Sequence, residues 1–405
     1  MRIVVDMQGC QTNTSRNRGI GRYSLALAQG MARNAGDHEI WLALNGELKD
    51  AIEPIQAAFD GLIPRERMRV FDVSNRVAGL RVPRRWRRPL NEHRREAFLR
   101  QLKPDFVHIS SPFEGQDAVL SIERSQPRAG HAVTLYDLIP LQYPDIHLKA
   151  RASRDLYMRR LEAAKRADVL LAISEASRQD ALAALDMSPE RIVNISSAVD
   201  PSFRPVRLSE DEEAKVRARY GILRPFVMYT GGLDPRKNIE GLIAAYARLP
   251  LLLREKHQLL IVCAVGETRR AELDALARAQ GLKPNEVIFS GFVDHDELIQ
   301  LYNLCALFVF PSLHEGFGLP VLEAMACGAP TIGSNNSSIP EVIDFEPALF
   351  DARDVNSIKD KIEHALKDAE FSRDISARGL KRSAFFSWDR SAVVALAAME
   401  TLRAA

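Results

Sequence analysis

The chain has 405 residues, enough for two domains that each bury a core of their own. Its apolar fraction of 46% and charged fraction of 27% are ordinary for a globular protein, and a net charge of only +2 gives no global case for a nucleic-acid binder. The four cysteines are scattered without a CxxC or a Cys/His cluster, which argues against structural zinc and for a reducing cytoplasm.

Short β-rich runs alternate with longer helical patterns, as is typical of parallel sheets wound with helices. The chain opens on a strand rather than on a signal peptide's apolar core, and no apolar stretch approaches the roughly 18–20 residues of a membrane span, so we expect a cytoplasmic protein. The strands predicted in the first half are 2–6, 39–44, 105–109, 132–136, 168–173 and 191–196. Those predicted in the second half are 226–230, 258–264, 286–290, 306–310 and a short one near 330–332.

A linker is predicted between the halves, at 201–205 and in the charged run 210–213. Helical patterns at about 355–367 and 371–383 close the second half, and an amphipathic helix follows from 387 to 402. The predicted fold class is α/β, with two Rossmann-like, doubly wound parallel sheets facing a cleft. We expect a first domain over 1–205, a second over 206–385, and a C-terminal helix at 386–405 that crosses back to the first domain.

The most informative motif places Glu315 and Glu323 eight residues apart, around a glycine-rich turn that runs from a strand into a helix. Pro320 suits the first helical turn, and Gly328 suits the position just past its end. Backbone N–H groups at a helix start attract phosphate, and glycines let a ligand approach the main chain. The two carboxylates would reach opposite ends of one molecule, which indicates a nucleotide sugar.

A second motif follows the first strand of the second half. Gly231 and Gly232 precede two adjacent cations, Arg236 and Lys237, just before a helix. Arginine can grip a phosphate bidentately and lysine supplies a point charge, so the motif predicts a pyrophosphate clamp. The alternative is a solvated basic turn.

The first half carries weaker signals at the ends of its strands. Gly19 and Gly21 lie in a loop before the first helix and indicate either a tight turn or a ligand contact. Asp137 follows the strand at 132–136 and could accept a proton or hold a sugar hydroxyl, or it could cap the next turn. The segment 110–115 follows another strand and could line an acceptor, or it could form a turn with a helix start.

Taken together, these motifs resemble the retaining glycosyltransferases of family 4, which have the two-domain GT-B fold. The resemblance covers nearly the whole chain and is strengthened by matches at 173–178 and 386–389. Within the family the chain most resembles bacterial mannosyl- and rhamnosyltransferases that build O-antigen-like polysaccharide. The resemblance implies a retaining hexosyltransferase that needs neither a metal nor another cofactor, with a donor that is GDP-linked rather than UDP-linked and a saccharide or lipid-linked acceptor.

The resemblance also implies residue roles. Glu315 would hold hexose hydroxyls, while Arg236 and Lys237 would neutralise the leaving diphosphate; with Asp137 these are the expected catalytic residues. Glu323 would bind the ribose. The residues expected at the donor are Gly19, Gly21, Gly231, Gly232, Phe317, Gly318, Leu319 and Glu323. The acceptor-side candidates are Tyr136, Glu114 and Arg22.

One departure concerns Tyr136, because many relatives carry histidine there, beside the donor sugar. Tyr136 could take over that contact, or Asp137 could. This keeps open a silent nucleotide-sugar-binding module of a larger polymerase, and a GT-B epimerase is a further alternative.

Seven arginines surround Trp86 between Arg81 and Arg95, in a predicted loop and early helix. Such a cluster could touch an anionic membrane surface or a lipid-linked acceptor at the inner membrane face, or it could be a solvated loop.

Overall fold

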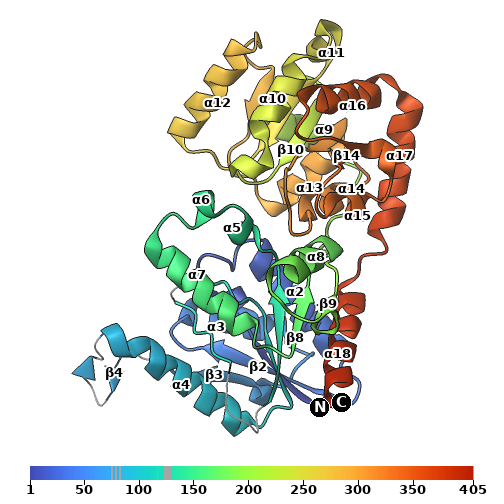
Figure 1. Cartoon of the computed structure of the whole chain (residues 1–405). Helices are drawn as coiled ribbons and strands as arrows, with labels where there is room; N and C mark the ends of the chain where they lie inside the picture. Colours follow the sequence, from blue (N-terminus) through green and yellow to red (C-terminus); the bar gives the residue numbers. More distant parts are fainter. Residues whose placement is uncertain (74–75, 78–79, 82–83, 116, 123–128, 405) are drawn as a thin grey trace. The chain divides into compact units, whose positions relative to one another are not determined.

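The structure is a computed structural model that describes residues 1–73, 76–77, 80–81, 84–115, 117–122 and 129–404. It forms two compact units, the first made of 1–197 with 387–405 and the second of 198–386 (Figure 1). Each unit contains one parallel sheet flanked by helices, which confirms the predicted α/β class. The predicted domain boundaries were 205 and 385. That the two units face a cleft stays a prediction.

The first unit is built on a seven-stranded sheet in which every neighbouring pair is parallel. In spatial order its strands are β3 (Met68–Phe71), β2 (Glu39–Asn45), β1 (Arg2–Asp6), β6 (Phe106–Ile109), β7 (Gly130–Leu135), β8 (Val169–Ala172) and β9 (Ile192–Asn194). Strand β3 was not predicted, because it is only four residues long and Arg69, exposed at the sheet edge, interrupts its apolar run. A short antiparallel pair, β4 (Arg76–Val77) and β5 (Leu80–Arg81), lies outside this sheet.

The helices of the first unit include one from the far end of the chain. They are α1 (Gln8–Gln11), α2 (Gly19–Arg33), α3 (Ile52–Ala58), α4 (Arg84–Leu102), α5 (Ile139–Gln142), α6 (Pro144–His147), α7 (Arg151–Ala164), α8 (Glu175–Ala184) and α18 (Trp388–Ala404). Helix α18 packs on α2: a side chain at Gly30 would meet the carbonyl of Trp388 at 2.7 Å, and Arg33 pairs with Asp389 at 2.7 Å. The two chain ends therefore lie in the same unit (Figure 1).

The arginine-rich segment is mostly helix rather than loop, since α4 begins at Arg84 and continues through Pro89. Residues 82–83 lie outside the described part of the chain. Arg95 is 1% exposed, and its guanidinium donates to Asp6 Oδ2 at 2.6 and 2.9 Å and to the Ser121 carbonyl at 2.9 Å. The expectation that Arg95 meets a membrane is therefore wrong, because this side chain anchors α4 to β1.

The second unit has a six-stranded parallel sheet. Its spatial order is β12 (Val287–Phe289), β11 (Gln258–Val262), β10 (Phe226–Thr230), β13 (Leu307–Phe310), β14 (Thr331–Ser334) and β15 (Leu349–Phe350). All residues of β10, β11 and β13 are buried, as expected for a sheet covered on both faces.

The helices of the second unit surround this sheet (Figure 1). They are α9 (Glu210–Tyr220), α10 (Ile239–Ala247), α11 (Leu251–Lys256), α12 (Glu267–Ala279), α13 (His295–Leu304), α14 (Leu319–Ala326), α15 (Ile339–Ile343), α16 (Val355–Lys367) and α17 (Ala369–Ser383). The acidic run 210–213, predicted as linker, is the first turn of α9, where Ser209 and Glu212 form a capping box. Across the described residues, none of the helices is both long and apolar enough to cross a membrane.

Candidate active site

The strand order of the second unit marks one edge of its sheet as a binding site. From β10 the chain order runs outward through β11 and β12, whereas β13, β14 and β15 run outward in the opposite direction. Neighbouring parallel strands whose connections diverge leave a crevice at their carboxyl ends, where ligands of such sheets bind. The two most informative sequence motifs follow β10 and β13, so the topology brings them to the same point.

The loop after β10 is shaped by its glycines and by a cap. Gly231 has φ +154° and passes so close to Tyr229 that a side chain there would lie 2.6 Å from the tyrosine hydroxyl. A side chain at Gly232, in contrast, would meet nothing within 4 Å. Asp234 then caps the short 3₁₀ turn 235–237 by accepting the backbone N–H of Arg236 at 3.1 Å. This turn presents Arg236 and Lys237 side by side.

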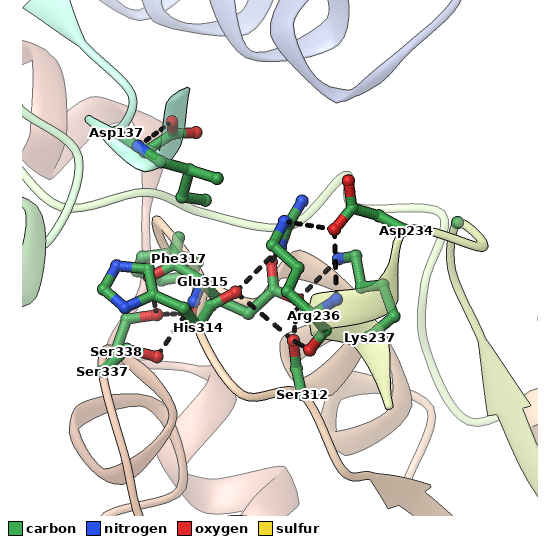
Figure 2. Close-up of polar contacts among 12 residues, drawn as sticks. Asp137, Asp234, Arg236, Lys237, Ser312, His314, Glu315, Phe317, Ser337 and Ser338 are labelled. Carbon is green, nitrogen blue, oxygen red and sulfur yellow. Dashed lines mark hydrogen bonds and ion pairs between the residues drawn. The ribbon is translucent and has the colours of Figure 1, made fainter. Parts of the chain in front are cut away.

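Glu315, in the loop after β13, binds both cations directly (Figure 2). Its Oε2 accepts from Arg236 Nη1 at 2.9 Å, and its Oε1 accepts from Lys237 Nζ and from Ser312 Oγ, each at 2.5 Å. Arg236 Nη1 also donates to the carbonyl of His314 at 2.8 Å. Two adjacent predicted site residues and a third that is far from them in the sequence therefore form one charged cluster.

The charge state of this cluster follows from burial and pairing. Burial alone would raise the pKa of the Glu315 carboxyl, but the Lys237 and Arg236 cations outweigh it and hold the pKa below its usual range. Among the described residues, Lys237 Nζ hydrogen-bonds only Glu315, and an ammonium has three donors. The cluster can therefore keep Glu315 ionised and still offer N–H groups to an anion.

A third loop, which follows β14, supports the turn around Glu315 and was missed by sequence reasoning (Figure 2). Ser337 Oγ accepts the Glu315 backbone N–H at 3.0 Å. The fully buried Ser338 hydroxyl lies 3.2 Å from the carbonyl of Glu315 and 2.7 Å from that of Phe317. Serines in a polar loop carry no distinctive sequence signal, and only the pairing of β13 with β14 brings them to this turn.

The turn itself depends on Gly318, the residue that precedes α14. Gly318 has φ +99°, in the region that favours glycine, and a side chain there would lie 2.6 Å from Ile339 Cδ1. Phe317 is buried, with its ring edge-on to Phe386 at 5.6 Å. Helix α14 then begins at Leu319 and is followed by Gly328 at φ +78°, which matches the predicted helix start and end.

Glu323 lies within α14 and is not part of the charged cluster. Its side chain is buried, and Oε2 accepts the Tyr302 hydroxyl at 2.9 Å. The carboxylate is thus held by a neighbouring helix, α13, one helical turn beyond the glycine-rich segment. Its predicted ribose contact stays a prediction.

The first unit repeats the same topological arrangement, with β1 and β6 at the point where the connections diverge. Glu114, in the loop after β6, is buried and accepts hydroxyl hydrogen bonds from Thr12 at 2.5 Å and Ser15 at 2.6 Å, both in the segment after β1. This acceptor-side candidate therefore joins the two loops at the carboxyl edge. Arg22 is exposed on α2.

Gly19 and Gly21 belong to the first turn of α2, not to the loop predicted before it. A side chain at Gly21 would lie 2.5 Å from the carbonyl oxygens of Ser15 and Arg16. Gly21 therefore has a steric role within the chain, allowing the preceding loop to pack on the helix. A donor contact at either glycine stays a prediction.

Tyr136 and Asp137, which stand where many relatives carry histidine and aspartate, have different surroundings. The Tyr136 side chain is buried, and its hydroxyl lies 2.8 Å from Ser24 Oγ and donates to the Ser110 carbonyl at 3.1 Å. Asp137 is partly exposed, and its Oδ1 accepts the backbone N–H of Ile139 at 3.0 Å (Figure 2). Asp137 thus caps the turn before α5, and its contact with a substrate stays a prediction.

Comparison with known families decides the class. Residues 17–203 match the model "Glycosyltransferase Family 4", and residues 213–382 match "Glycosyl transferases group 1". The chain belongs to glycosyltransferase family 4. Family 4 membership confirms the resemblance found in the sequence, and the family implies a nucleotide-sugar donor and an acceptor.

Two curated family 4 relatives come from Escherichia coli. The serotype-specific mannosyltransferase WbdA is 37% identical over 98% of this chain and 47% of its own length. The O-antigen chain mannosyltransferase B is 29% identical over 92% of this chain and 93% of its own length. The chain thus spans about half the length of the WbdA relatives it matches.

Solved structures agree on the GT-B fold of family 4. Sucrose-phosphate synthase from Thermosynechococcus elongatus superposes with a TM-score of 0.67 at 21% identity, covering all of this chain and 98% of that one. Anabaena HepE in complex with UDP and glucose superposes with a TM-score of 0.67 at 18% identity over the full length of both chains. At these identities the likeness concerns the fold alone.

Proposed function

We propose that the chain transfers mannose, with retention of configuration, from a GDP-linked donor to the growing chain of a bacterial cell-surface polysaccharide. The observation that carries the proposal is the contact of Arg236 and Lys237 with Glu315 at the carboxyl edge between β10 and β13. The choice of mannose and of an O-antigen-like acceptor is supported by the two Escherichia coli mannosyltransferases.

The cluster suits the charge that develops as the glycosidic bond breaks. Negative charge builds on the leaving diphosphate, and two preorganised cations stabilise it most in the transition state. Glu315 keeps both cations in place and presents its carboxylate to donor hydroxyls. Because Arg236 and Lys237 already supply positive charge at the phosphates, we expect transfer without a metal.

The neighbouring loops would hold the rest of the donor. The start of α14, with Gly318 before it, directs backbone N–H groups of its first turn at the phosphates. Gly232 leaves open space in which a ligand can approach the main chain. Glu323, held by Tyr302, would bind the ribose hydroxyls.

On the acceptor side we assign the contact with substrate to Asp137 rather than to Tyr136. The Tyr136 hydroxyl is buried against Ser24 and Ser110, whereas Asp137 is partly exposed at the carboxyl edge of the first sheet. In a front-face retaining route the donor phosphate helps to deprotonate the acceptor, and Asp137 would orient the acceptor hydroxyl.

The setting is proposed as the inner membrane face, with further modules as partners. Trp86, near the start of α4, is 57% exposed beside Arg88, which suits contact with an anionic membrane surface. The partnership with other modules is supported by the length of the WbdA relatives, which is about twice that of this chain.

A thermal-shift screen against GDP, UDP, GDP-mannose and UDP-glucose, each with and without EDTA, tests the donor. Ligands that bind the native state raise the melting temperature, so a shift with GDP-mannose that EDTA does not remove is expected. Incubation with GDP-mannose and an oligomannoside, followed by NMR of the product, should show a new α-mannosidic bond. Selective binding of UDP would overturn the proposal that the donor is GDP-linked. Donor binding without transfer would indicate a silent module.

A further inference from the structure

The first unit has a large groove between α4 and α7 that the transfer mechanism does not use. Its volume is about 1440 Å³. That exceeds the roughly 300–1,000 Å³ of sites for a drug-sized ligand. The loops after β2, β3 and β6 also line the groove, through Leu48, Val73 and the segment 117–122.

Both helices present one polar face to this groove. On α4 the lining residues recur at helical spacing, from Arg87 and Asn91 to Glu96 and Arg100. At 1.5 Å rise per residue this face is about 20 Å long. On α7, Asp155 and Arg159 are among the residues that form the opposite wall. The groove is therefore elongated, and its walls can both donate and accept hydrogen bonds.

The charges along the groove are balanced. Arginines and carboxylates line it in equal number, six of each. An anionic polymer or an anionic lipid headgroup is held by an excess of positive charge, which this lining does not provide. Guanidinium donors interspersed with carboxylate acceptors suit a neutral ligand rich in hydroxyls, since each hydroxyl both donates and accepts.

One wall also carries a polar atom that is shielded from solvent. Asn91 Oδ1 is out of contact with solvent, and no donor among the described residues reaches it. A buried polar atom without a partner is costly, so its presence in a groove points to a ligand that supplies the hydrogen bond.

The groove is rigidly joined to the predicted acceptor side. The buried Arg160 on α7 donates to the carbonyls of Pro112, Gly115 and Ala118, all in the loop after β6 that carries Glu114. Arg95 on α4 holds the other end of this loop through the Ser121 carbonyl. The walls are thus preorganised, and the groove is lined in part by the loop that carries the acceptor-side candidate Glu114.

We propose that the groove between α4 and α7 binds the growing polysaccharide chain, as a non-catalytic subsite for a neutral oligohexose behind the acceptor end. This inference rests on the proposed function, because it takes the polymer product as its ligand. It implies that long acceptors are used better than short ones, through contacts remote from the reacting hydroxyl.

The test uses two double variants of the full chain. Asn91→Ala with Asp155→Ala removes one polar group from each wall. His93→Ala with Arg154→Ala is the matched control, since both residues are exposed on the same helices and do not line the groove. Calorimetry with oligomannosides of two and of about ten units measures binding, and kcat/KM for the same acceptors measures use. Melting temperatures establish that each variant is folded.

The groove variant should bind the long oligomannoside about tenfold more weakly, and its kcat/KM should fall at least fivefold more for the long acceptor than for the short one. Equal losses for both lengths, or no loss of binding, would overturn the proposal. If the groove variant lost binding to phosphatidylglycerol vesicles while its oligomannoside affinity was unchanged, the groove would be a lipid site. That result would also overturn the proposal. Binding of the long oligomannoside without any transfer from GDP-mannose would reject the proposed function but would still support the groove as an oligosaccharide-binding site.

Discussion

Replacing Lys237 by alanine tests the charged cluster most directly, because it should affect turnover and stability for two different reasons. The donor's leaving diphosphate would lose one of two cations, and removal of a comparable transition-state contact costs about 10²–10³ in kcat, or about 2.7–4 kcal/mol. Substrate affinity should change less, since the leaving-group charge is fully developed only in the transition state.

The same variant leaves the buried Glu315 carboxylate with one of its two cationic partners, Arg236. The side chains of Lys237 and Glu315 are 11% and 8% exposed, so the pair is little screened by solvent. Removing one partner of a buried pair costs about 3–5 kcal/mol, and we expect about 3 kcal/mol because Arg236 and Ser312 remain. For a domain the size of the second unit this lowers Tm by roughly 6–12 °C.

The pH dependence of the Tm difference between the native protein and Lys237→Ala tests whether the ionised Glu315 causes the loss of stability. In the native protein the pKa of Glu315 lies below its unfolded value, so its stabilisation is present at neutral pH and is lost as the pH falls through the folded pKa. Without Lys237 the folded pKa rises, and protonation at low pH removes the cost of the buried charge. The Tm difference between the two proteins should therefore be largest near pH 7 and should narrow towards about pH 4.5.

The assays are saturating-donor kinetics and thermal unfolding across this pH range, with Lys381→Ala, an exposed lysine of the same unit, as control. Adding Glu315→Gln to Lys237→Ala should restore part of the lost stability without restoring turnover. A kcat within twofold of the native value would refute the phosphate clamp. A Tm difference that does not change with pH would show that the ionisation of Glu315 is not the cause.

Four further substitutions separate structural from substrate-binding roles. Ser338→Ala removes the buried hydroxyl whose single O–H is shared between the carbonyls of Glu315 and Phe317, and it should cost about 1–3 kcal/mol in urea unfolding and raise the KM for donor. An unchanged KM would show that Ser338 contributes to stability alone. Gly318→Ala should lower both stability and donor affinity because of its positive φ and its contact with Ile339, whereas Gly232→Ala should leave Tm unchanged and weaken only donor binding, as measured by calorimetry. Asp137→Asn keeps an acceptor for the Ile139 N–H, so we expect an unchanged Tm and a lower kcat. A kcat equal to that of the native protein would show that Asp137 only caps the turn.

Much of the local structure can be predicted from sequence because it is set by neighbouring residues. The strand 226–230 and the helix 355–367 were predicted with the bounds that the structure shows, since a short buried run and a long amphipathic period are unambiguous patterns. The acidic run at 210–213 was assigned to a linker, although its capping box opens a helix. The short edge strands β3 and β15 were missed, because two to four residues without alternation carry little signal.

For the site, the motifs could be read from sequence: two carboxylates around a glycine turn, a cationic pair behind two glycines, and with them the family. These signals are local, because the proposed phosphate recognition needs particular residue types at fixed spacing. The fold, in contrast, was needed to show that Glu315 binds Arg236 and Lys237 rather than standing apart from them, and that Ser337 and Ser338 support its turn. The fold also shows that Arg95 is buried on Asp6, in contrast to the exposed Trp86 of the same basic cluster. Those contacts depend on the order and register of strands distant in the chain, which no spacing of residues within one segment specifies.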